Sequence, residues 1–84
     1  MEELVHREVP SPNWDERALP VSMAVLHYTG MPTGEEALER MCSAEAKVAA
    51  HYMIGEDGIV TRLVAEENRA WHAGRSYWRG ITDV

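Results

Sequence analysis

The fold of this chain depends on the stretch VSMAVLHY at residues 21–28, in which a run of mostly apolar residues leads into His27. A nearly continuous apolar run of this length predicts a strand that is buried on both faces of a sheet. The chain then breaks at Gly30 and Pro32. His27 is therefore expected at the mouth of a buried strand, where zinc enzymes often place a ligand. Local sequence alone favours the plainer interpretation, a histidine that is hydrogen-bonded at a strand end.

A short helix is predicted after this strand, over about residues 34–43. Thr33 and Glu36 stand at the spacing of a capping box, in which the threonine caps the helix and the glutamate reaches back to its start. Apolar side chains follow at helical spacing. These are Leu38, Met41 and Cys42.

A β-hairpin is predicted next, from residues 48–54 to residues 59–64. Glu56, Asp57 and Gly58 between the two runs are a hairpin turn signal. Beyond residue 68 the chain is rich in Trp, His, Gly and Arg and has little periodicity, so a loop with large side chains is expected there. Upstream, prolines and polar residues over 8–20 indicate an irregular, mostly extended arm.

These elements indicate an α/β fold with a central mixed β-sheet flanked by helices. About three strands and one helix come from this chain of 84 residues. We expect residues 1–20 to be the extended arm, and residues 21–84 to hold the strands, the helix and the loop with large side chains. Three strands and one helix form only a small hydrophobic core, so we expect the chain to need contacts with further polypeptide for its stability.

Composition narrows the class of protein. The net charge of −6 argues against nonspecific nucleic-acid binding, which relies on basic patches. One cysteine, Cys42, excludes an internal disulfide and is expected to be a buried thiol. The sequence has neither an apolar stretch long enough for a membrane span nor an N-terminal signal core. We therefore expect a cytoplasmic protein, or a periplasmic or cell-envelope protein if a leader has been removed.

The histidines are the residues with the clearest capacity for chemistry. His6 lies near a terminus and has no expected role, and packing is favoured for His51 inside a strand. His72 lies beside small residues and suits either loop ordering or ligand contact. Catalytic zinc needs three protein ligands and an open position, and the spacing of these histidines matches no compact metal motif. No serine or cysteine nucleophile is supported either.

Taken together, several segments resemble one family, the zinc-dependent N-acetylmuramoyl-L-alanine amidases of type 2, which share a fold with peptidoglycan-recognition proteins. Their order and spacing make the resemblance specific. The segments are residues 10–17, 25–29, 45–54, 56–58, 69–74 and 76–78.

The resemblance implies a role for individual residues. His27 corresponds to the first zinc ligand, and His51 to a strand position that supports the site from inside the fold. Ala50 stands where some phage relatives have a catalytic tyrosine, which favours the branch with a glutamate as general base. The implied substrate-binding residues are Tyr28, Lys47, Trp71, His72 and Ala73, with Gly74 beside them.

The same resemblance implies that residues 1–84 are the N-terminal portion of a single amidase domain. The glutamate base, the second zinc histidine and the third ligand are expected beyond Val84, so no catalytic residue is assigned within the chain. We expect the chain alone to be inactive and to bind Zn²⁺ weakly, and a second chain or segment to complete the domain. The expected substrate is peptidoglycan or a muropeptide. The alternatives are a non-catalytic peptidoglycan- or muropeptide-binding module and a fragment completed by a partner or by domain swapping.

Overall fold

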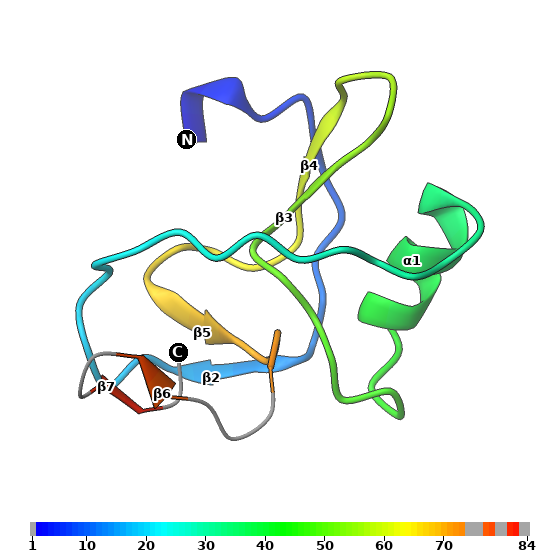
Figure 1. Ribbon diagram of the computed structural model, residues 1–84. Helices are drawn as coiled ribbons and strands as arrows, with labels where there is room; N and C mark the ends of the chain where they lie inside the picture. The colour runs from blue at the N-terminus through cyan, green and yellow to red at the C-terminus, as the bar shows by residue number, and fades with distance from the viewer. Residues whose placement is uncertain (1, 74–76, 79–80, 83–84) are drawn as a thin grey trace.

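A mixed sheet of three strands lies at the centre of the computed structural model, which describes residues 2–73, 77–78 and 81–82 (Figure 1). The strand order is β1-β4-β3, and two further pairs, β2-β5 and β6-β7, lie outside this sheet. The elements are η1 (Glu2–Leu4), β1 (Arg7–Glu8), β2 (Trp14–Glu16), α1 (Gly34–Met41), β3 (Tyr52–Ile54), β4 (Val60–Arg62), β5 (Asn68–Ala70), β6 (Tyr77–Trp78) and β7 (Ile81–Thr82).

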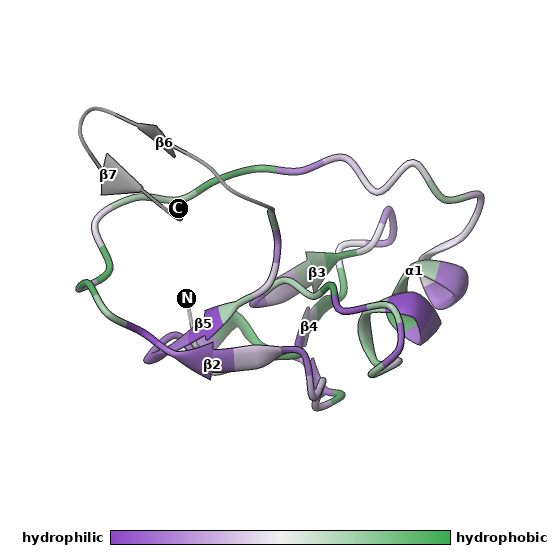
Figure 2. Cartoon of the chain, turned by 90° about the horizontal axis from the view of Figure 1, so that it is seen from below, coloured by the Kyte–Doolittle hydropathy of each residue, from purple (hydrophilic) through white to green (hydrophobic). Residues whose placement is uncertain are grey.

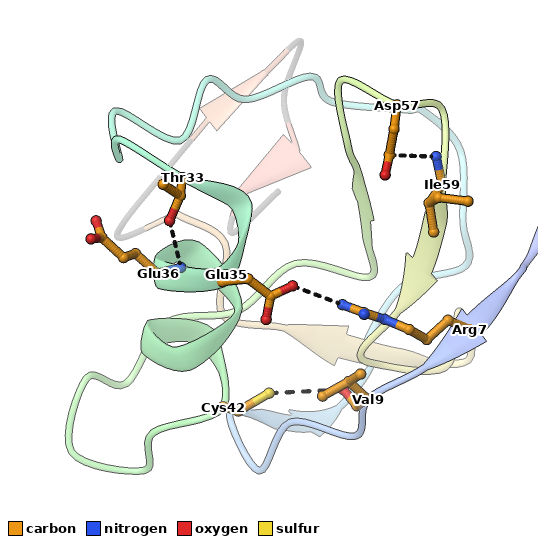
Figure 3. A network of polar contacts seen from close by, with 8 residues as sticks. All are labelled: Arg7, Val9, Thr33, Glu35, Glu36, Cys42, Asp57 and Ile59. Atoms are coloured by element: carbon orange, nitrogen blue, oxygen red, sulfur yellow. Dashed lines mark hydrogen bonds and ion pairs between the residues drawn. The ribbon is translucent and has the colours of Figure 1, made fainter.

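The predicted hairpin is confirmed as the antiparallel pair β3-β4, with Ile54 opposite Val60. Gly58 has a φ of +84°, a backbone conformation that residues with a side chain rarely adopt. The Asp57 Oδ1 atom accepts a hydrogen bond from the Ile59 N–H at 3.0 Å (Figure 3). Gly58 therefore supplies the positive φ of the turn and Asp57 its side-chain hydrogen bond, as these residue types predict.

The third strand of the central sheet comes from the arm. β1 runs parallel to β4, and flanking hydrogen bonds extend the pairing from His6 to Ser11, whose N–H donates to the Leu63 carbonyl at 2.9 Å. β2 forms an antiparallel pair with β5, with Trp14 opposite Ala70. Parts of the arm, expected to be mostly extended, thus form two short paired strands. The expectation of a loop directly beyond residue 68 is wrong for residues 69–70, which belong to β5.

The predicted buried strand over residues 21–28 is also wrong. This segment has no regular secondary structure, and Leu26 is 93% exposed. Figure 2 shows the chain between β2 and α1 following a wide arc around the strands. A buried strand needs a hydrogen-bonded neighbour and apolar cover on both faces. None of the described strands pairs with these residues.

The predicted helix forms over α1, and the Thr33 side chain accepts a hydrogen bond from the Glu36 N–H, as the capping box predicts. The helix ends at Met41, so Cys42 is its C-terminal cap rather than an interior residue. Two contacts join this region to β1 and the residue after it (Figure 3). They are the Arg7–Glu35 ion pair at 3.7 Å and the Cys42 Sγ contact with the Val9 carbonyl at 3.8 Å.

The core lies between α1 and the strands. Its buried members are Leu38, Ala49, Leu63, Val64 and Ala70, with Met41, Cys42 and Met53 packed against them. The expected α/β class, with a few strands in a mixed sheet and one helix, is confirmed. This small core fixes β5 against the rest of the molecule, which matters for the residues that follow it.

Candidate functional site

Two of the residues singled out from the sequence meet in space. The His27 Nε2 atom lies 2.9 Å from the His72 Nδ1 atom, within hydrogen-bond distance. The ring centroids are 5.0 Å apart and the planes are inclined by 56°. One of the two facing nitrogens therefore donates its N–H, and the other accepts this hydrogen bond with its lone pair. The predicted metal ligand and a predicted substrate-binding residue thus form one pair.

His72 is positioned by the strand that precedes it. The N–H of Trp71 donates to the Asn13 carbonyl at 3.1 Å, and the Trp71 carbonyl accepts from Ala49 at 3.0 Å. The His72 N–H donates to the Ala70 carbonyl at 3.0 Å. His72 therefore follows a backbone that is anchored on both sides, whereas exposed His27 lies on a segment without regular structure.

Asn13 is the residue that sequence reasoning missed. Its side chain is 1% exposed, and its amide Nδ2 atom lies within 3.1 Å of the carbonyl oxygens of Met41, Ser43 and Val48. Buried carbonyls need such partners, and an asparagine amide has two N–H groups with which to supply them. The only sequence signal was the position of Asn13 within the arm segment that carries the family resemblance.

Asp15 and Arg69 reinforce the β2-β5 pair. The Arg69 Nε and Nη2 atoms donate to the two oxygens of the Asp15 carboxylate at 2.8 and 2.7 Å. The hydrogen bonds from Arg69 hold the pKa of the Asp15 carboxyl below its usual value, and partial burial opposes this shift. The two-point contact fixes the orientation of the strand that leads to His72.

His51 belongs to a separate cluster of polar contacts with Arg17 and Asn68. Its Nε2 atom lies 2.8 Å from the Asn68 carbonyl and 3.1 Å from the Arg17 Nη2 atom. The Arg17 guanidinium also donates to the carbonyls of Glu66 and Asn68. The Tyr52 hydroxyl donates to Glu66 at 2.5 Å. The predicted supporting position of His51 thus lies within a half-buried polar network.

The remaining predicted site residues do not converge on the histidine pair. Tyr28 is 94% exposed, and Lys47 is exposed with a left-handed φ of 52°. Trp71 is half-buried and Ala73 is exposed. Gly74 lies outside the described residues. The described part of the chain therefore brings together His27 and His72, and leaves Tyr28 and Lys47 at the surface.

Imidazole nitrogens are ligands that zinc commonly takes, so the donor type at the pair fits this metal. Within the described residues, no group of three or more His, Cys, Asp or Glu side chains could hold a metal ion. Burial raises the pKa of the Cys42 thiol, which keeps it in the protonated form that binds metals poorly. The described residues therefore provide fewer than the three protein ligands that a catalytic zinc site needs.

A hollow of about 190 Å³ lies elsewhere, along β1 and β4, and it includes neither histidine of the pair. Its lining residues include Glu8, Trp14, Arg62 and Asn68.

Among the described residues, none of the helices has the length and apolar character needed to cross a membrane.

Comparison with known proteins defines the class. The sequence profile of the N-acetylmuramoyl-L-alanine amidase family matches residues 17–82. This match includes His27 and His72 and extends over most of the chain. The chain belongs to this family, as the resemblance of its segments predicted.

Individual relatives are 1,6-anhydro-N-acetylmuramyl-L-alanine amidases. The chain is 29% identical to the enzyme AmpD of Haemophilus influenzae over 93 aligned residues, which cover 88% of this chain and 50% of the relative. Identity to AmpD of Salmonella typhimurium is 31%, with the same coverage. AmpD of Escherichia coli is 30% identical, and 51% of its length is covered. The chain thus spans about half the length of these relatives. No solved structure gives a significant match.

Proposed function

We propose that this chain is part of a zinc-dependent amidase that hydrolyses the amide bond between N-acetylmuramic acid and the L-alanine of its stem peptide. The observation that carries the proposal is the family match over residues 17–82, which contains a histidine pair assembled by the fold. The names of the relatives favour a soluble 1,6-anhydromuropeptide as the substrate. We further propose a cytoplasmic location.

His27 is the proposed first ligand of the zinc ion. Bound zinc supplies a water molecule of lowered pKa and polarises the scissile carbonyl. In the hydrolysis, the hydroxyl of water joins the lactyl carbonyl carbon, the C–N bond breaks, and a proton goes to the leaving alanine nitrogen. The contact that supports a role for His72 in the proposed site is that of its Nδ1 atom, which lies 2.9 Å from the His27 Nε2 atom.

The proposed general base is a glutamate that follows Val84 in the encoded protein. The acidic residues of α1 and of the hairpin turn are poor substitutes, because they lie exposed on other elements. Reading the coding sequence after Val84 tests this point. A strand ending in glutamate, followed by a histidine and an aspartate or cysteine, is the expected result.

Activity is tested with a synthetic N-acetylmuramyl peptide and mass spectrometry of the products. We expect a free peptide with N-terminal L-alanine from the zinc-loaded protein encoded with its following sequence, and none after His27→Ala. Binding without cleavage, by a protein whose coding sequence ends at Val84, would instead support the alternative of a non-catalytic muropeptide-binding module.

A further inference from the structure

The backbone of Trp71, directly before His72, is held on two sides. Its N–H donates to the Asn13 carbonyl at 3.1 Å, and its carbonyl accepts from the Ala49 N–H at 3.0 Å. The direction of the half-buried indole therefore depends on rotation about its side-chain bonds. The family resemblance implied that this side chain binds the substrate, so whatever fixes its rotation also shapes the binding site.

The pairing of β2 with β5 places Asp15 on the same face of the ladder as Trp71. Asp15 lies opposite Arg69, and the hydrogen bond between Trp71 and Asn13 continues this register. Side chains two residues apart in a strand point to the same face, so Arg69 and Trp71 share a face with Asp15. Diagonal neighbours in an antiparallel pair lie about 7–8 Å apart, which an aromatic side chain can span. The Trp71 indole is therefore within reach of the Asp15 carboxylate.

The Asp15 carboxylate takes hydrogen bonds on this face. The Arg69 guanidinium donates to both of its oxygens at 2.8 and 2.7 Å. These bonds from Arg69 lower the pKa of the Asp15 carboxyl most, and the Trp71 indole N–H lowers it further as an additional donor. The indole nitrogen is the single polar atom of the Trp71 side chain, and it can only donate. A carboxylate that is itself oriented by an arginine can thus fix the rotation of the indole.

We propose that Asp15 is a positioning residue, which holds the Trp71 indole in the direction that contacts the muropeptide. This inference rests on the proposed function. Trp71 lies next to His72, whose ring contacts the proposed zinc ligand His27. The indole offers a flat apolar face to the C–H groups of the substrate, and a ring that is already held loses little conformational freedom on binding. Asp15 acts through this ring and does not touch the substrate.

The contact is tested by ¹H–¹⁵N NMR of the indole groups in the 84-residue chain. Asp15→Asn should move the indole signal of Trp71, assigned with Trp71→Leu, because the charged acceptor is lost. The indole of Trp14 is the internal control and should keep its signal, since neighbouring residues of a strand point to opposite faces. Glu16→Gln, at the exposed carboxylate next to Asp15, should move neither signal. A Trp71 signal that stays in place in Asp15→Asn would overturn the inference.

The positioning role is tested by kinetics of the zinc-loaded protein, encoded with its following sequence, on a synthetic N-acetylmuramyl peptide. Asp15→Asn should raise KM by about threefold or more and leave kcat within about twofold of the parent, because it disturbs binding rather than the reacting atoms. A smaller fraction of folded protein would instead lower the apparent kcat at an unchanged KM. Trp71→Leu should also raise KM, and adding Asp15→Asn to it should raise KM no further.

The outcomes separate the inference from the proposed function. A KM of Asp15→Asn equal to that of Glu16→Gln would overturn the inference and leave the amidase activity intact. So would a full effect of Asp15→Asn in the Trp71→Leu background. A parent protein that does not cleave the peptide would overturn the proposed function, and the substrate role of Trp71 with it, even where the indole signals show the contact.

Discussion

The backbone carbonyl of Asn13 accepts a hydrogen bond from the backbone N–H of Trp71 at 3.1 Å. The side chain of the same asparagine reaches the carbonyls at the end of α1 and before β3. One buried residue of the arm therefore connects the helix, the hairpin and the segment that carries His72. This connection makes Asn13 a structural determinant of the candidate site, although it lies outside that site.

Asn13→Ala should lower the free energy of unfolding by about 1–3 kcal/mol, because it removes the buried amide that binds the carbonyls of three half-buried residues. Asn13→Asp should be at least as harmful, since it turns carboxylate oxygens toward those carbonyls. Urea denaturation followed by circular dichroism measures both. Glu39→Gln, on the exposed face of α1, is the control and should change stability by less than about 0.5 kcal/mol. An Asn13→Ala variant as stable as this control would contradict the assignment.

Acid should weaken the β2-β5 pair through Asp15. Because the Arg69 hydrogen bonds lower the pKa of the folded carboxyl, ionised Asp15 favours the folded state. This stabilisation is present above the unfolded pKa of about 4 and is lost as the pH falls through the lower folded pKa. The urea midpoint should therefore decline in this window, and the decline should be smaller in Asp15→Asn. A ¹³C NMR titration of the Asp15 carboxyl that showed a raised pKa would refute this account.

Leu26→Glu should leave the stability of the chain within about 0.5 kcal/mol of the parent, because the side chain is 93% exposed. A leucine buried in a two-sided strand would instead make a charged replacement severely destabilising. Leu38→Ala, at a core position that is 5% exposed, is the matched contrast and should cost about 2–5 kcal/mol. Comparable losses in Leu26→Glu and Leu38→Ala would show that residues 21–28 are buried after all.

Thr33→Ala should destabilise α1 by about 1 kcal/mol, because the Glu36 N–H loses its side-chain acceptor. Thr33→Ser retains the hydroxyl and should behave like the parent chain. Amide hydrogen exchange in the first turn of the helix measures the effect locally. Equal protection in the alanine and serine variants would mean that the cap contributes nothing.

The elements that the sequence predicts correctly are those with signals inside a few neighbouring residues. Thr33 and Glu36 mark the start of the helix, and Asp57 and Gly58 mark the hairpin turn. Their geometry depends on local hydrogen bonds and backbone preferences, so it can be inferred without knowledge of the rest of the fold.

The errors concern residues whose structure depends on distant partners. The run at residues 21–28 has the composition of a buried strand, but burial requires neighbours that composition cannot specify. β1 and β2 are too short to show periodicity and form by pairing with β4 and β5. The meeting of His27 with His72 is likewise a product of tertiary structure, across a separation of 45 residues. Family resemblance drew attention to both histidines, but it did not predict their contact.

The pairing of the arm with β4 and β5 has a consequence for the order of folding. Asp15 and Arg69 are 54 residues apart in the chain, as are Glu8 and Arg62. Contacts between residues so far apart in the chain form slowly, because a large loop must close, at a cost in conformational entropy, before the contacts can stabilise the structure. On the ribosome, the arm therefore has no pairing partner until β4 and β5 have emerged, and the α1 region and the β3-β4 hairpin are available to form before it docks.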